Sequence, residues 1–162
     1  MKKYFMPIIL FGCITVLAGD KLLAQDYKTL PPIIITPTTS RVPEKVWKSF
    51  QNYYSNAQNA EWYQLNRKYL VKYMTEDKKN QAVFGKRGRL VYNISYGYEN
   101  NLPEEIRKQV KSNYNDYNIT AAIKVTQYKR TIWVVNVEDA KKMIQVKLED
   151  GEMEEIESYN KI

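Results

Sequence analysis

The chain contains no histidine, and its single cysteine lies near the N-terminus, at position 13. These absences remove the commonest general base and the thiolate nucleophile, so neither a serine–histidine–aspartate triad nor a cysteine-based active site is expected. Zinc is disfavoured because its sites are built mainly from histidine and cysteine. The sequence also has no glycine-rich phosphate-binding loop. We therefore predict a protein that is not an enzyme and that has neither a metal nor a cofactor.

Carboxylates are the one remaining source of acid–base or metal chemistry. Residues 149–155 read Glu-Asp-Gly-Glu-Met-Glu-Glu, a run dense enough in acids to attract Ca²⁺. The spacing matches no known calcium loop, and a solvated hairpin tip is the favoured interpretation.

The N-terminus carries an export signal. Lys2 and Lys3 precede an apolar run at 5–18, which is shorter than the roughly 20 residues that a membrane span needs. We predict a signal peptide at 1–24 and a periplasmic or secreted protein with no membrane span after signal removal. Leu-Phe-Gly-Cys at 10–13 loosely resembles a lipoprotein box, so anchoring through Cys13 is the alternative to a cysteine that is removed with the signal.

A Pro/Thr-rich segment follows at 25–41 and predicts an extended linker. Its β-branched residues 33–35 are alternatively an edge strand.

The rest of the chain repeats itself. Val-Pro-Glu-Lys-Val-Trp-Lys-Ser-Phe at 42–50 aligns with Leu-Pro-Glu-Glu-Ile-Arg-Lys-Gln-Val at 102–110, and at an offset of 63 Gly88 aligns with Gly151. Each copy begins with a proline and a helical apolar pattern. Eight strand-like runs follow, four after each helix, at 61–65, 69–74, 82–85, 90–98, 119–128, 131–137, 143–148 and 153–159. We predict an α+β fold, a tandem duplication of a helix plus a four-stranded antiparallel sheet, with repeats at 42–101 and 102–162 forming one domain.

Four stretches resemble bacterial periplasmic PepSY-like domains, also described as β-lactamase-inhibitor-protein-like. They are Val42-Pro43-Glu44-Lys45-Val46, Tyr54-Ser55-Asn56-Ala57 with Trp62, Tyr69-Leu70-Val71-Lys72-Tyr73, and Leu102-Pro103-Glu104-Glu105-Ile106. Such domains often carry Tyr-Pro where this chain has Tyr54-Ser55. The resemblance implies a small α+β fold with a binding or inhibitory role outside the cytoplasm, and it implies no catalytic residues.

Aromatic side chains are the main functional signal. Of the 14 tyrosines, all but Tyr4 lie beyond the predicted signal peptide, and tyrosine is enriched in protein-binding hot spots. A sheet covered by a helix on one face leaves the other face free for docking. We predict a partner-binding surface made of Tyr69, Tyr73, Tyr92, Tyr96, Tyr98, Lys72, Arg87 and Arg89. The alternative is that this stripe faces the helices and forms core.

Two other partner classes follow from composition. The net charge of +7 with nearby aromatics suits nucleic acid, but predicted export argues against that, so no nucleic-acid partner is expected. The alternative function is small-molecule binding or sensing in an aromatic cleft between the repeats. The leading prediction is an exported module that docks a protein partner.

Overall fold

The computed structural model describes residues 35–37, 42–76 and 78–162. The predicted signal peptide at 1–24, with Cys13, lies outside these residues, as does most of the predicted linker at 25–41. Within the described ranges, no helix is long and apolar enough to cross a membrane.

Two helices are each followed by four strands. The elements in chain order are β1 (Ile35–Pro37), α1 (Glu44–Tyr53), β2 (Gln58–Leu65), β3 (Lys68–Thr75), β4 (Lys78–Gly85), β5 (Leu90–Gly97), the short 3₁₀ helix η1 (Glu99–Asn101), α2 (Glu104–Asn113), β6 (Asn118–Gln127), β7 (Arg130–Glu138), β8 (Lys142–Glu149) and β9 (Glu152–Asn160). All eight strand-like runs of the sequence are therefore present.

The strands form one nine-stranded antiparallel sheet whose spatial order follows the chain from β1 to β9. Strand β5 pairs with β6 over five residue pairs, from Asn93↔Thr126 to Gly97↔Ala122, and this pairing joins the two halves. Strand β1 lies inside the predicted linker and pairs antiparallel with β2, and it shares only Ile35 with the edge strand predicted as the alternative at 33–35.

Each helix is short and depends on packing for its stability. In α1, Pro43 lies at the N-cap, Glu44 pairs with Lys48 at 2.6 Å, and Val46 and Phe50 are buried. The second helix has the same design, with Pro103 at its N-cap and Val110 buried.

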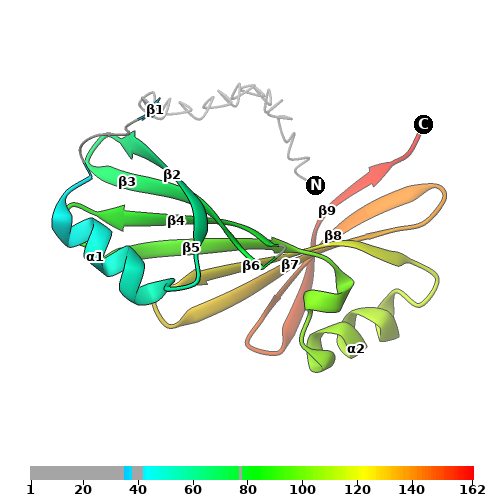
Figure 1. Cartoon of the computed structure of the whole chain (residues 1–162). Coiled ribbons are helices and arrows are strands. Elements are labelled where there is room, and N and C mark those ends of the chain that lie inside the picture. Colours follow the sequence, from blue (N-terminus) through cyan, green and yellow to red (C-terminus); the bar gives the residue numbers. More distant parts are fainter. Residues whose placement is uncertain (1–34, 38–41, 77) are drawn as a thin grey trace, which may run out of the picture. The chain divides into compact units, whose positions relative to one another are not determined.

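Both helices lie on the same face of the sheet. Under α1, the cross-strand row Val71–Ala82–Asn93 belongs to the face that contacts Phe50. Under α2, the row Gly97–Ala122–Val135 belongs to the face that contacts Val110. Asn93 and Gly97 are four residues apart on β5, so they share one face. Figure 1 shows α1 against the β2–β5 half and α2 beside the β6–β9 half.

Two buried clusters follow from this arrangement. Below α1 the core consists of Val46, Phe50, Tyr69, Val71, Tyr73, Ala82 and Phe84. Below α2 it consists of Leu102, Val110, Ile119, Ala122, Trp133, Val135, Val137, Ile144, Val146 and Leu148. Aromatic rings dominate the first cluster: Phe50 contacts Tyr73 edge-on with ring centroids 5.2 Å apart. The second cluster is mainly aliphatic.

Two details of the predicted strands are wrong. Strand β4 begins at Lys78 and not at residue 82, because Asn80 satisfies its amide inside the sheet and a polar start does not prevent pairing. Simple alternation along the predicted strand 90–98 would put Leu90 on the face of Tyr92. A β-bulge between Val83 and Phe84 shifts the register, so Leu90 packs on the helix-side core while Tyr92 points to the opposite face.

The β4–β5 turn is held against α1. Gly88 has φ +83°, and a Cβ built on it would lie 2.6 Å from the Lys45 carbonyl oxygen and 2.5 Å from Ser49 Oγ. Gly151, at the β8–β9 turn, has the same φ but open space around it. Both turns thus carry the backbone strain of a positive φ, but only the turn at Gly88 also carries steric contact with α1. Substituting each glycine therefore measures the two effects separately.

We expect Gly151→Ala to lower the free energy of unfolding by about 1–2 kcal/mol, because only the positive φ opposes a side chain. Gly88→Ala should lower the free energy of unfolding by about 1–3 kcal/mol more than Gly151→Ala does, because α1 must also move to make room for the methyl group. Urea denaturation of both variants measures the difference. Equal losses would show that α1 does not rest on the turn.

Candidate binding surfaces

The sheet face opposite the helices, here called the open face, is the first candidate. Neither α1 nor α2 covers it. Its central residues are Lys72 and Met74 on β3, Gln81 on β4, Tyr92, Ile94 and Tyr96 on β5, Ile123 and Val125 on β6, and Ile132 and Val134 on β7.

Apolar side chains continue across the junction of the two halves. One cross-strand row runs Ile94–Val125–Ile132, and the next runs Tyr96–Ile123–Val134. Tyr96 is 36% exposed, and the other five are partly buried. Partly exposed apolar side chains that continue over several strands are typical of an interaction site.

A groove of about 700 Å³ lies beside these rows on β3–β5. Side chains of Lys72, Gln81 and Tyr96 line it, and Gln81 Nε2 donates to the Tyr96 hydroxyl at 3.1 Å. Lys72 Nζ lies 4.9 Å from the centroid of the Tyr63 ring. The groove thus offers an aromatic wall, an amide and a cation to one ligand surface.

The prediction that five tyrosines share one docking face is wrong for Tyr69 and Tyr73. They are only 8% and 3% exposed and belong to the core below α1. The reason is register: Tyr73 pairs with Asn80, which pairs with Ser95, so Tyr73 lies on the face of Ser95 and not on that of Tyr96. The two β3 tyrosines therefore face the helices and form core, as the alternative interpretation predicted, while Tyr92 and Tyr96 lie on the open face.

The other predicted residues are spread over separate places. Lys72 is on the open face, and Tyr98, 69% exposed, follows β5 at the start of η1. Arg87 and Arg89 lie at the β4–β5 turn, where they line a recess of about 420 Å³ with Arg67. The guanidinium of Arg89 is 5.9 Å from the ring centroid of Tyr128. These residues do not form one site with the groove.

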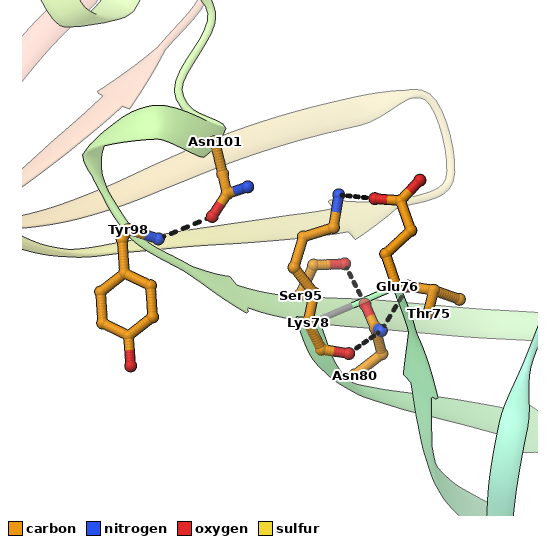
Figure 2. Close-up of polar contacts among 7 residues, drawn as sticks. All are labelled: Thr75, Glu76, Lys78, Asn80, Ser95, Tyr98 and Asn101. Atoms are coloured by element: carbon orange, nitrogen blue, oxygen red, sulfur yellow. Dashed lines mark hydrogen bonds and ion pairs between the residues drawn. The ribbon is translucent and has the colours of Figure 1, made fainter.

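A polar chain crosses the helix-side face between the two cores. The Tyr73 hydroxyl donates to Asn93 Oδ1 at 2.9 Å, and Asn93 Nδ2 donates to Ser95 Oγ at 3.3 Å. Ser95 Oγ donates to Asn80 Oδ1 at 2.6 Å, and Asn80 Nδ2 donates to Thr75 Oγ1 at 2.8 Å (Figure 2). Burial raises the pKa of Tyr73, and the nearby Tyr54 adds to this effect, so the phenol keeps its proton and remains a donor.

Glu149, at the start of the acidic hairpin, is already paired. Glu149 accepts two hydrogen bonds from Arg130, at 2.7 and 3.0 Å, and Lys147 lies 3.6 Å away. The guanidinium lowers the pKa of Glu149. The described part of the chain holds no group of three or more acidic, histidine or cysteine residues arranged for a metal ion.

Several residues of the open face were not among those predicted from the sequence to bind a partner. Ile123, Val125, Ile132 and Val134 alternate along β6 and β7, and this period-two pattern is the signal that marks them. The pattern does not say which of the two faces the helices cover. That choice depends on the β5–β6 register.

No protein-family model matches the chain, and no curated protein matches it in sequence. Solved structures do share its fold. A DUF2874 family protein from Bacteroides ovatus has a TM-score of 0.58 at 18% identity, covering 75% of this chain and 89% of its own. A BLIP-like protein from Bacteroides fragilis has a TM-score of 0.59 at 17% identity, covering 75% and 87%.

A third structure, a Bacteroides eggerthii protein provisionally described as periplasmic, has a TM-score of 0.56 at 15% identity and covers 75% of this chain and 90% of its own. These likenesses establish a BLIP-like α+β fold. They agree with the β-lactamase-inhibitor-like part of the predicted resemblance, and none of these descriptions mentions PepSY.

The Tyr73–Asn93 hydrogen bond yields a stability prediction. Tyr73→Phe should lower the free energy of unfolding by about 1–3 kcal/mol, because it leaves the buried Asn93 oxygen without a donor. Tyr96→Phe is the matched control and should change stability by less than about 0.5 kcal/mol, because water replaces the exposed hydroxyl. Chemical denaturation of both variants tests this, and an unchanged Tyr73→Phe protein would contradict it.

Proposed function

We propose that this chain is an exported, non-catalytic binding module that docks a protein partner on its open face. One observation carries the proposal: a row of aliphatic and tyrosine side chains continues over β5, β6 and β7 on the face that neither helix covers. The BLIP-like fold supports a role in binding. The predicted signal peptide and the neighbour provisionally described as periplasmic support the compartment.

The open face also suggests the chemistry of the partner. Aliphatic side chains at its centre suit an apolar patch, and Tyr96 supplies a large, rigid contact at its edge. Lys72 and Lys79 stand on neighbouring strands beside the groove, with Glu61 nearby. A partner that places an acidic group near the two lysines and apolar side chains over Ile94 and Ile123 fits this arrangement. The mechanism is occlusion of the partner's surface.

We also propose that the chain is a tandem duplication, related to the PepSY-like domains. Equivalent positions of the two halves have the same backbone geometry. The N-cap residues Pro43 and Pro103 have ψ 139° and 145°, the C-cap residues Tyr54 and Tyr114 have φ −137° and −132°, and the turn residues Gly88 and Gly151 both have φ +83°. A duplicated unit explains why two short helices stand on one face of one sheet.

The docking surface is tested by capture from a periplasmic extract of the source organism. The wild-type chain should retain a defined protein, and Tyr96→Ala should reduce its retention at least about tenfold, as expected for an aromatic hot spot. Tyr53→Ala is the matched control: Tyr53 is exposed on α1, away from the open face, and its loss should leave retention unchanged.

A photo-crosslinking residue at Ile94 provides an independent readout. It should form an adduct with the captured protein, whereas the same residue at Gln51 on the exposed side of α1 should not. Adducts from Gln51 alone, or equal retention by the Tyr96 and Tyr53 variants, would place the partner elsewhere.

A further inference from the structure

A second cleft lies on the helix side, at the junction of the two halves. It has a volume of about 310 Å³, at the lower end of the range for small-molecule sites. Residues of strands β3 to β7 line it, together with Asn101 of η1 and Pro103 at the start of α2. Both halves of the chain are needed to build it.

Small residues give the cleft its depth. Gly97 on β5 pairs directly with Ala122 on β6, and larger side chains surround this pair. Trp133 closes one side and is nearly buried. On the other side Asn101 leans over Gly97 so closely that a Cβ there would lie 2.6 Å from Asn101 Oδ1.

The side-chain acceptors in this cleft are already used. Asn101 Oδ1 accepts from the Tyr98 backbone N–H at 2.9 Å, and Asn80 Oδ1 accepts from Ser95 at 2.6 Å (Figure 2). The backbone sets both amide orientations, because the Tyr98 N–H can only donate and the Lys78 carbonyl that faces Asn80 Nδ2 can only accept. A ligand therefore finds few side-chain acceptors here.

Donors remain available. Asn101 Nδ2 makes no hydrogen bond to a described residue, and Lys124 forms no ion pair with one; its Nζ lies 5.7 Å from the Trp133 ring centroid. Lys78 contributes a second ammonium, 3.3 Å from the exposed Glu76, a contact of the weak surface type. No aspartate or glutamate is among the described residues that line the cleft.

We propose that this cleft binds a small oxyanion, the carboxylate or phosphate group of a low-molecular-weight ligand. Lys124 and Asn101 are the principal contacts, and Lys78 adds charge. Lys78, Lys124 and Asn101 all line this cleft, whose side-chain acceptors are occupied, and oxyanions take charge-assisted hydrogen bonds from ammonium and amide donors. Lys78, Lys124 and Asn101 do not line the open-face groove, so anion binding and protein docking can fail separately, although Asn80 and Tyr96 line both cavities.

The test is a titration of ¹⁵N-labelled protein with sodium acetate and, separately, with sodium phosphate, at constant ionic strength. Saturable shifts of the Gly97 and Ala122 backbone amides are expected with at least one anion, and the anion that saturates identifies the carboxylate or phosphate source. Lys124→Gln should raise the anion concentration at the titration midpoint at least about tenfold, the effect of losing one charge-assisted contact.

Asn101→Asp tests the site more specifically than Lys124→Gln does. It keeps the oxygen that accepts from Tyr98 N–H, so the fold of η1 is preserved, but it replaces the amide donor with a negative oxygen. Binding should be lost while the amide spectrum stays dispersed. Lys129→Gln, at the exposed β6–β7 turn, is the charge-matched control and should bind as the wild type does. Shifts that rise without saturation, or equal midpoints for the Lys124 and Lys129 variants, would overturn the site.

Discussion

The pairing of β5 with β6 is the interaction on which the rest of the structure depends. Each half alone would be one ten-residue helix on four strands, a unit that buries little apolar surface. Five residue pairs between β5 and β6 turn the halves into one sheet. Because Gly97 faces Ala122 in this register, both helices must pack on the same side. The opposite side then continues uninterrupted from one half to the other.

The two faces of the sheet consequently have different chemistry. The helix side holds two apolar clusters, with a hydrogen-bonded polar chain and a donor-lined cleft between them. A polar chain is tolerated there because its members satisfy one another. On the open face the order is reversed: the apolar isoleucine and valine side chains lie at the junction of the two halves, and polar groups lie beside them. A strand can serve both faces because its side chains alternate, so Ser95 and Tyr96, adjacent on β5, belong to opposite faces of the sheet.

Local patterns predicted most of the elements. The prolines before both helices, the apolar spacing of Val46 and Phe50, and the glycines at the turns are properties of a few neighbouring residues, and such properties are readable from sequence. Part of the candidate site was also predictable: Tyr92, Tyr96 and Lys72 lie on the open face. Arg87, Arg89 and Tyr98 are exposed but do not join one surface with them, since a turn's direction depends on what it packs against.

By itself, the sequence determined the helix and strand segments, the turns between them, the absence of histidine, and the identity of the residues that alternate along each strand. Only the tertiary structure decided which alternating set faces the helices. Tyr73 and Tyr96 look equivalent in their own strands, yet one is core and the other surface, and a single bulge reverses Leu90. The physical reason is that alternation relates residues within a strand, whereas a face is shared between strands only through their register.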